Sequence, residues 1–232
     1  MPPTRGFVTS LRSDALSQLA VIAEIKRRSP SKGVLREDIV AAQLAQQYQL
    51  GMASCLSVLT DEESFGGSID DLQQSRAATS IPVLRKDFTV SERDVCDARL
   101  MGADCVLLIV AALSQAELVD FHQLATEIGV DVLVETHDEA EVDRAVAAGA
   151  KMIGVNQRDL QTFQVDHQRA VRMAAVIPSE IVKVAESGVR DAHDAQSLRN
   201  AGYDAVLVGE SLVVSNDPAA VIGSLRVTTT TN

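Results

Sequence analysis

Residues 21–33 of this chain read VIAEIKRRSPSKG, and their first half is typical of a buried β-strand. Ile22 and Ile25 suit an apolar interior, yet Glu24 and Lys26 stand two positions apart beside them. Side chains two apart in a strand point to the same face, so this strand presents a carboxylate and an ammonium together. An isolated charge is costly in an apolar interior, and the strand must therefore end where charges can pair or bind a ligand.

Seven further runs of apolar and β-branched residues follow this strand, each beginning 21 to 33 residues after the one before it. They cover 54–60, 81–88, 105–110, 131–136, 152–158, 181–187 and 205–211. The segments between them carry apolar residues at a spacing of three to four, and several end in glycine, as amphipathic helices do. Nearly continuous apolar strands that alternate with helices indicate a parallel sheet covered on both faces.

Eight such units in 232 residues predict an α/β protein that folds as a closed (β/α)8 TIM barrel. The alternative is an open doubly wound sheet, but no glycine-rich dinucleotide-binding turn follows the first strand. We expect the barrel to cover residues 21–226. A short N-terminal extension would cover residues 1–20, and a disordered tail would cover residues 227–232.

The composition narrows the class of partner. Lys and Arg number 21 against 32 Asp and Glu, a formal net charge of −11, which argues against nucleic acid and anionic membranes while still allowing a local basic pocket. The three cysteines lack the spacing of a metal site and are typical of a reducing compartment. No apolar run approaches the roughly 18 residues of a membrane span, and the N-terminus lacks the apolar segment of a signal peptide. We expect a cytoplasmic protein without a metal site.

A barrel places its chemistry at the carboxyl ends of its strands. Polar residues gather at these ends in this sequence: Glu24, Lys26, Ser57, Lys86, Glu135, Asn156, Arg158, Glu186, Ser187 and 209–211. Grouped at one mouth, they can pair with one another and with a ligand. Each one alone is more often a solvated or salt-bridged loop residue, and for Glu24 with Lys26 a structural ion pair and a functional pair are equally open.

Other polar residues receive different interpretations. Arg85 and Asp87 lie out of phase with the lysine between them, so we expect them to pair with each other or with neighbouring loops. Ser29 and Ser31 flank a proline and also fit a simple turn. The four histidines share no spacing, and none receives a role.

Two strand ends carry small residues typical of an anion site. ESG stands at 186–188 and VGES at 208–211, each ahead of a predicted helix. Small residues allow backbone N–H groups and a helix N-terminus to face an anion. In barrels of this kind the loops after the seventh and eighth strands often bind phosphate. The two loops therefore predict a phosphorylated small-molecule ligand.

Eight motifs follow one another between about residue 20 and about residue 225: AEIKRRSPSKG, LSVLTD, PVLRKDF, LLIVAAL, LVETH, GVNQRDLQTF, VAESGV and VLVGESL. In this order they resemble the indole-3-glycerol phosphate synthase family of tryptophan biosynthesis. The resemblance implies a TIM barrel and a carboxy-lyase. Its substrate would be 1-(2-carboxyphenylamino)-1-deoxyribulose 5-phosphate and its products indole-3-glycerol phosphate, CO2 and water, with no metal or organic cofactor.

The resemblance also implies roles for the catalytic residues. Lys86 would be the general acid that protonates the substrate carbonyl or the departing hydroxyl, and a desolvated lysine of lowered pKa would donate more readily. Glu135 would be the general base or would stabilise the developing iminium. Lys26 would bind the anthranilate carboxylate or share proton transfer, with Glu24 orienting it. Asn156 would complete this catalytic group.

The remaining roles concern binding. Residues that would position the substrate chain and its hydroxyls are Asn156, Arg158 and Glu186. Residues that would hold the phosphate are Ser29, Ser187, Gly188, Gly209 and either Glu210, through its backbone, or Ser211. Phe65 and Phe88 would flank the aromatic ring.

The same resemblance implies an N-terminal helical extension packed over the barrel mouth. RGFVTSLR at 5–12 is similar to the end of such an extension, of which the chain shows only about 20 residues, so we expect weaker substrate binding than in a longer relative. Two rival functions stay open: a phosphate-barrel isomerase such as phosphoribosylanthranilate isomerase, and a non-catalytic barrel that binds phosphorylated ligands. The isomerase would offer a cysteine where this chain has Lys26. Either a monomer or a homodimer fits the sequence.

Overall fold

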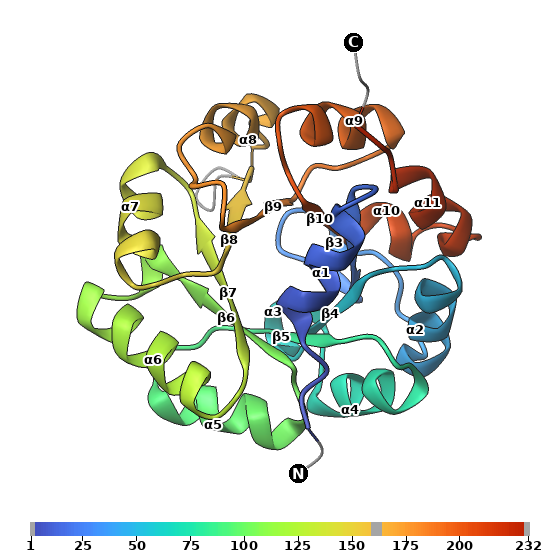
Figure 1. Cartoon of the computed structure of the whole chain (residues 1–232). Helices are drawn as coiled ribbons and strands as arrows, with labels where there is room; N and C mark the ends of the chain where they lie inside the picture. Colours follow the sequence, from blue (N-terminus) through green and yellow to red (C-terminus); the bar gives the residue numbers. More distant parts are fainter. Residues whose placement is uncertain (1–2, 159–163, 230–232) are drawn as a thin grey trace.

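The computed structural model describes residues 3–158 and 164–229 of the chain. Within them, parallel strands close into a barrel in the order β1-β10-β9-β8-β7-β6-β5-β4 (Figure 1). The barrel strands are β1 (Ala20–Ile25), β4 (Cys55–Leu59), β5 (Val83–Lys86), β6 (Cys105–Ile109), β7 (Asp131–Thr136), β8 (Met152–Asn156), β9 (Val182–Glu186) and β10 (Ala205–Val208). The predicted (β/α)8 barrel is confirmed, and each predicted apolar run coincides with one of its strands, although β1 begins one residue before the run at 21–26.

The helices form a ring around the barrel (Figure 1). They are α2 (Ala41–Leu50), α4 (Ile69–Ala78), α5 (Glu92–Met101), α6 (Gln115–Glu127), α7 (Glu139–Ala147), α8 (His167–Ala174), α9 (Ala192–Asn200) and α11 (Pro218–Leu225), with short turns α3 (Glu62–Phe65), α10 (Glu210–Val213) and η1 (Val110–Ala112). Several begin where a serine or aspartate caps the first turn. The Ser114 side chain accepts from the backbone of Glu117, whose own side chain caps Ser114 in return. Such caps stabilise a helix by about 1 kcal/mol each.

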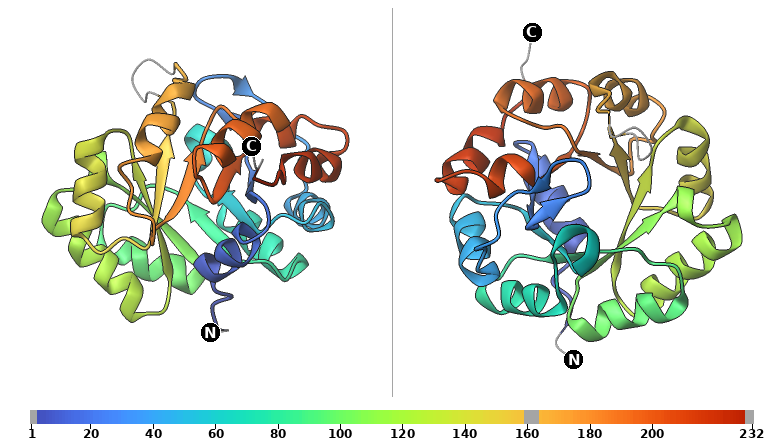
Figure 2. Two further views of the ribbon diagram at one scale, coloured as in Figure 1. Left: turned by 45° about the horizontal axis from the view of Figure 1, so that its top comes forward. Right: turned by 180° about the vertical axis from the view of Figure 1, so that it is seen from behind.

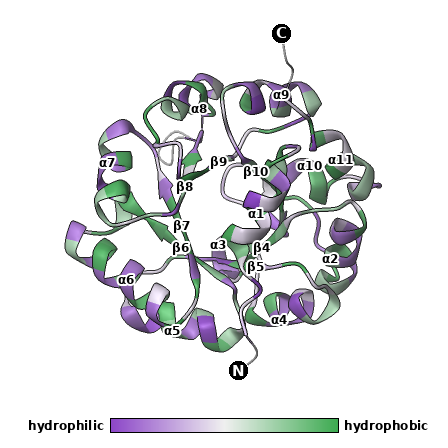
Figure 3. Ribbon diagram, viewed as in Figure 1, coloured by the Kyte–Doolittle hydropathy of each residue, from purple (hydrophilic) through white to green (hydrophobic). Residues whose placement is uncertain are grey.

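Two separate apolar cores follow from the alternation of side chains along the strands. One lies between the strands and the helices and contains Leu56, Val106 and Ile153. The other lies inside the barrel and contains Ile22 and Leu84 among others. Figure 3 shows hydrophobic residues on the strands and hydrophilic residues on the outer faces of the helices. None of the helices in the described residues is long and apolar enough to cross a membrane.

Helix α1 (Phe7–Ala15) closes the amino-terminal end of the barrel. Phe7, Val8 and Leu11 join the core inside the barrel. The backbone N–H of Val8 donates to Asp131 Oδ2 at 3.0 Å, at the first residue of β7. Figure 2 shows α1 and the β2–β3 hairpin at opposite ends of the barrel.

The position of α1 corrects one expectation. Residues 5–12 were expected to resemble the end of a segment packed over the mouth, but they lie at the other end of the barrel, because Phe7 and its neighbours fill the apolar space below the strands. This segment therefore stabilises the barrel floor and makes no contact with the mouth. At the other terminus, the carbonyl oxygens of Val227 and Thr228 accept hydrogen bonds of 2.8 and 2.9 Å, so the hydrogen-bonded chain extends past residue 226. Residues 230–232 lie outside the described residues.

The barrel floor gives a first prediction. Replacing Phe7 by alanine removes a fully buried ring and should lower the free energy of unfolding by about 3–5 kcal/mol. The measurement is urea denaturation followed by circular dichroism. The control is Leu16→Ala at the end of the same helix, where the side chain is 88% exposed and the change should stay within about 0.5 kcal/mol. Equal effects of the two changes would contradict this role for Phe7.

Candidate active site

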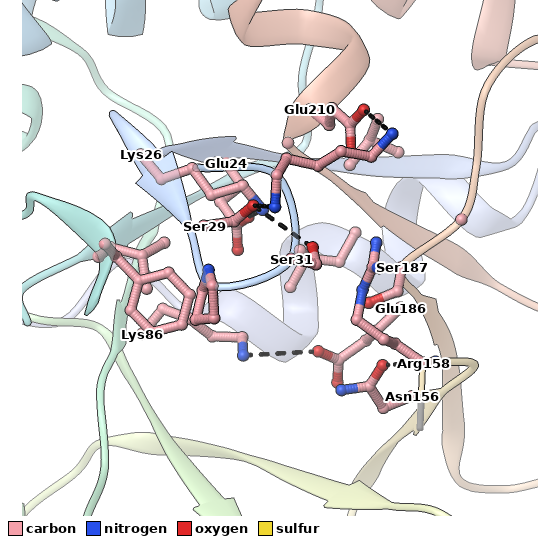
Figure 4. A pocket seen from close by; sticks show the side chains of 18 of the residues that line it. Glu24, Lys26, Ser29, Ser31, Lys86, Asn156, Arg158, Glu186, Ser187 and Glu210 are labelled. Atoms are coloured by element: carbon pink, nitrogen blue, oxygen red, sulfur yellow. Dashed lines mark hydrogen bonds and ion pairs between the residues drawn. The ribbon is translucent and has the colours of Figure 1, made fainter. Parts of the chain in front are cut away.

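A cavity of about 960 Å³ opens at the carboxyl ends of the strands. Every site residue expected from the sequence lines it: Glu24, Lys26, Ser29, Phe65, Lys86, Phe88, Glu135, Asn156, Arg158, Glu186, Ser187, Gly188, Gly209, Glu210 and Ser211. Its volume lies within the range of small-molecule sites. Figure 4 shows Lys86 on one side of the cavity and Glu186, Asn156 and Arg158 on the facing side.

The first strand brings Glu24 and Lys26 into the mouth as an ion pair. Lys26 Nζ lies 2.6 Å from Glu24 Oε1, and Glu24 is 4% exposed. Tyr48 Oη donates to the backbone carbonyl of Glu24 at 3.0 Å and fixes the strand at this point. The hydroxyl of Ser57, the residue paired with Glu24 on β4, approaches Glu24 Oε2 at 3.4 Å. The pair is both a structural ion pair and part of the cavity wall, so the two alternatives are not exclusive.

Lys86, Glu135 and Glu186 form the centre of the site. Lys86 Nζ lies 3.3 Å from Glu135 Oε2 and 3.8 Å from Glu186 Oε2. Asn156 Nδ2 donates to Glu135 Oε1 at 3.1 Å, while Asn156 Oδ1 accepts from the backbone of Arg158 at 3.0 Å. The carboxylates come from β7 and β9 and the ammonium from β5, so the closed barrel is what brings them together.

The charges in this cluster shift one another's protonation. Burial by itself would lower the pKa of Lys86, but the carboxylates of Glu135, Glu186 and Glu24 outweigh it and hold the pKa above its usual value. The expectation of a lowered lysine pKa is therefore wrong, because the neighbours of this ammonium are anions. Burial opposes ionisation of both carboxyls, yet Lys86 and His137 hold the pKa of Glu135 below its usual range.

The pKa of Glu186 shifts in the opposite direction to that of Glu135. Burial and the nearby charge of Glu135 raise its pKa above the usual range, because two carboxylates share one ammonium. Its Oε1 is buried and has no hydrogen-bond partner among the described residues. The cluster therefore pairs one ionised carboxylate, Glu135, with a carboxyl that retains its proton near neutral pH.

The loops after β9 and β10 line the other end of the cavity. Ser187 and Gly188 both have positive φ angles, 65° and 76°, so successive backbone N–H groups turn toward a common space. Gln157 Nε2 donates to the carbonyl of Ser187 at 2.8 Å and holds this turn. The Ser211 hydroxyl lies 3.5 Å from the carbonyl of Val189, so the two loops lie side by side. This geometry suits a phosphate group.

A small hairpin after β1 covers one side of the mouth, and sequence reasoning did not predict it. It consists of β2 (Arg28–Ser29) and β3 (Gly33–Val34), and its tip at 30–32 lines the cavity. Arg27 anchors the hairpin through two bonds to Asp71, of 2.6 and 2.9 Å. Lys32 at the tip lies 3.6 Å from Glu210 across the cavity. Ser31, which was interpreted from the sequence as a turn residue, and Lys32, which received no role, both line the cavity.

The apolar wall of the cavity is suited to an aromatic ring. Leu107, Ile109 and Leu207 rise from the barrel core beside Phe65 and Phe88. Phe88 is 52% exposed, so its ring can contact a ligand that enters the mouth. Arg85 and Asp87 pair at 3.0 Å, as expected, and Asp87 also lines the cavity.

His137 is a further residue near the site to which the sequence gave no role. It stands two positions after Glu135 in LVETH, and its ring lies behind Glu135 rather than in the cavity wall. Its Nε2 lies 3.4 Å from Glu135 Oε1 and its Nδ1 lies 3.0 Å from Glu141 Oε2. The spacing of two from the candidate base was the available signal. Among the described residues there is no group of three or more His, Cys, Asp or Glu that could hold a metal ion.

A closed parallel barrel with a charged cavity at the carboxyl ends of its strands defines a (β/α)8-barrel enzyme. A family model described as indole-3-glycerol phosphate synthase matches residues 1–225. The chain belongs to the indole-3-glycerol phosphate synthase family. Part of one family-like motif, residues 159–163, lies outside the described residues.

Curated relatives agree with this membership. The chain is 52% identical over 224 residues to an indole-3-glycerol phosphate synthase of Streptomyces griseus. The matched region covers 97% of this chain and 82% of that protein. It is 54% identical over 213 residues to an indole-3-glycerol phosphate synthase of Paenarthrobacter aurescens, covering 92% of this chain and 77% of that protein. The membership favours the synthase over the isomerase and over the non-catalytic barrel.

Solved structures support the fold at much lower identity. The 3-hexulose-6-phosphate synthase of Salmonella typhimurium superposes with a TM-score of 0.72 at 16% identity, covering 89% of this chain and 96% of that one. The thiamine phosphate pyrophosphorylase of Pyrococcus furiosus superposes with a TM-score of 0.67 at 15% identity, covering 89% and 93%. These likenesses show the shared barrel.

The close approach of Glu186 to β8 gives a second prediction. A Cβ at Gly154 would overlap Glu186 Oε1, so Gly154→Ala should displace this carboxyl and destabilise the protein by about 1–3 kcal/mol. The matched control is Gly223→Ala in α11, where nothing lies within 4 Å and helix propensity predicts a neutral or slightly stabilising effect. Thermal unfolding of both variants makes the comparison. If the Gly154→Ala protein were as stable as the Gly223→Ala protein, the Glu186 carboxyl would not be confined against Gly154.

Proposed function

We propose that the cavity converts 1-(2-carboxyphenylamino)-1-deoxyribulose 5-phosphate to indole-3-glycerol phosphate, CO2 and water by general acid–base catalysis. The observation that carries this proposal is the ammonium of Lys86 within 3.8 Å of both Glu135 and Glu186 at the barrel mouth. A proton donor on β5 and a proton acceptor on β7, the strands on either side of β6, thereby border a space large enough for the substrate. The membership of the chain in the synthase family supports the same reaction.

In the first step the ring closes. The aromatic carbon that bears the carboxylate attacks the ketone carbon, a carbon–carbon bond forms, and the carbonyl electrons move to oxygen. Lys86 protonates that oxygen. The ring nitrogen becomes an iminium, whose positive charge the ionised Glu135 stabilises. Because Lys86 is held fully protonated by its anionic neighbours, a donor is present whenever substrate binds.

The second step is decarboxylation. Lys26 binds the substrate carboxylate, and Glu24 orients Lys26 through their 2.6 Å ion pair. The bond to CO2 breaks, and its electron pair neutralises the iminium and restores the aromatic ring. Release of the neutral CO2 molecule removes the negative charge that Lys26 had bound.

The third step is dehydration. The hydroxyl formed in the first step takes a second proton and leaves as water, and a carboxylate removes one proton from the adjacent carbon to complete the indole. We assign this removal to Glu135, which then exchanges its proton with Lys86 over 3.3 Å. Two protons are delivered and one is recovered, so each turnover takes up one proton from solvent, as a decarboxylation requires.

Binding groups hold the substrate for these steps. We assign the phosphate to Ser29, Ser187, Gly188, Gly209, Ser211 and the backbone of Glu210, and the chain hydroxyls to Asn156, Arg158 and Glu186. Phe65 and Phe88 flank the aromatic ring. Remote binding of the phosphate orients the reacting carbons and lowers the entropic part of the barrier.

The same proposal has consequences for the cofactor requirement, the compartment and the oligomeric state of the enzyme. The reaction involves proton transfers and no change that needs an external oxidant or reductant, so the named side chains supply its chemistry and no cofactor is required. The acidic chain and its reduced cysteines suit the cytoplasm. We propose a monomer or a homodimer as the working unit.

Loss of the proton donor gives a third prediction. Lys86→Ala should lower kcat by at least about 10²–10⁴-fold, the range that general acid catalysis supplies. Substrate affinity should change little, because this ammonium acts on the reacting oxygen. The measurements are indole fluorescence for turnover and calorimetric titration for binding.

The control for this change is Lys151→Ala, which removes an exposed lysine ahead of β8 and should leave turnover unaffected. Binding lost in step with turnover in Lys86→Ala would assign Lys86 to substrate holding. Wild-type protein that binds the substrate without releasing indole glycerol phosphate would contradict the proposed function itself.

A fourth prediction concerns the phosphate. Ser29→Ala removes one hydroxyl donor and should raise KM roughly tenfold, since a hydrogen bond to a charged group contributes about 1.5–3 kcal/mol. The value of kcat should stay within about twofold because the contact is equal in the ground and transition states. Ser224→Ala, an exposed serine on α11, is the control. A fall in kcat with unchanged KM would place Ser29 at the reacting atoms instead.

A further inference from the structure

A partly buried histidine, His137, lies behind the candidate base and outside the cavity. His137 follows β7 directly, and its side chain is 15% exposed. Its two ring nitrogens face two carboxylates, Glu141 at 3.0 Å and Glu135 at 3.4 Å. The backbone N–H of His137 also donates to Glu141 Oε2 at 2.7 Å, so one carboxylate oxygen fixes both the ring and the backbone.

The groups around His137 come from several elements. Its own segment supplies Glu135 and Asp138, and the Asp138 side chain caps α7 by accepting from the backbone of Glu141 at 2.8 Å. Lys86 on β5 and Glu186 on β9 lie beyond Glu135, and Asn156 on β8 donates to the same Glu135 oxygen that His137 faces.

These groups form a continuous row in which acidic and basic side chains alternate. Its order is Glu141, His137, Glu135, Lys86 and Glu186. Glu135 is the central member, and each of its oxygens faces a basic group. Its Oε2 faces Lys86, while its Oε1 faces His137 and Asn156.

We propose that His137 is a positioning residue of the synthase reaction: as an imidazolium held by Glu141, it directs Glu135 Oε2 toward Lys86 and keeps Glu135, rather than Glu186, as the ionised carboxylate of the pair. The inference rests on the proposed function, because it gives that reaction its base. His137 touches neither the cavity nor the substrate, so it acts through Glu135 alone.

The physical reason is competition for one ammonium. Glu135 and Glu186 both approach Lys86, and only one of them can be ionised at low cost in so buried a place. A second cation next to Glu135 makes Glu135 the carboxylate that is ionised. Burial would lower the pKa of His137, but Glu135 and Glu141 raise it to about 9, so the ring is charged at neutral pH.

The sign of the pH effect follows from this arrangement. Without the imidazolium, Glu135 would hold its proton to higher pH, and the base would be protonated at a pH where the wild-type base is ionised. His137→Gln should therefore move the acidic limb of the kcat profile to higher pH by about one unit, so that kcat falls roughly tenfold at pH values below the wild-type midpoint. Substrate KM should change less than threefold, because no substrate contact is lost.

The matched control is His193→Gln, which replaces an exposed histidine at the start of α9 and should leave the profile unchanged. Glu141→Gln should shift the acidic limb in the same direction as His137→Gln, since it removes the anchor of the ring. His137→Lys restores a cation and should recover part of the loss. A variant that loses kcat with no shift of the limb, or raises KM and lowers kcat equally, would overturn the proposal.

A readout independent of turnover separates this inference from the proposed function. Carbon-13 NMR titration of the glutamate carboxyls should show one carboxyl, assigned to Glu135 by Glu135→Gln, whose pKa rises in His137→Gln. If wild-type protein has no synthase activity, the proposed function fails, and the titration still decides the role of His137. An unchanged Glu135 titration would overturn it.

Stability offers a second check. The folded-state pKa of His137 lies above its ordinary 6.5, so its charged form contributes stability that is complete below that value and is lost as pH rises through about 9. The loss of stability in His137→Gln should therefore be larger at pH 6 than at pH 10, as measured by urea denaturation at both values. An equal loss at both would mean that the ring stabilises the fold through packing and not through charge, and would overturn the proposal.

Discussion

The structure depends on placing three carboxylates inside a barrel mouth without leaving any of them as an isolated buried charge. Glu24, Glu135 and Glu186 are each at most 4% exposed. A buried carboxylate is costly unless it is paired or protonated. Here Glu24 pairs with Lys26, Glu135 pairs with Lys86 and Glu186 keeps its proton. The strands can carry these groups because all of them meet at one end of the barrel.

The rest of the barrel is arranged around this requirement. Below the charged layer the interior is apolar, and Phe7 from α1 packs into it from the amino-terminal end. Two glycines leave room for the carboxylates, since a Cβ at Gly154 would overlap Glu186 and one at Gly209 would overlap Glu24. Substituting either glycine would therefore act on the chemistry through its neighbour on an adjacent strand.

The barrel strands and much of the cavity wall could be predicted from the sequence because each strand has its own run of apolar residues. The apolar runs predicted every barrel strand, and the polar residues at the ends of most runs, such as Lys86, predicted much of the cavity wall. What could not be predicted depends on distances across the barrel. The direction of the Lys86 pKa shift requires knowing that its neighbours are anions. The hairpin at 28–34 has no alternation long enough to be predicted, and α1 fits either end of a barrel by composition alone.

A raised lysine pKa is compatible with its role as the acid. The free energy that holds the proton on Lys86 comes from Glu135 and Glu186, and it makes donation to a neutral ketone unfavourable. The oxygen that forms on ring closure is an alkoxide, far more basic than any amine, so the transfer becomes favourable only as the carbon–carbon bond forms. Proton donation is thereby coupled to the developing charge, which is the condition for stabilising the transition state rather than the bound substrate. In the proposed reaction Glu135, which holds the proton on Lys86, also stabilises the iminium that forms at the ring nitrogen, so one ion pair would serve both charges.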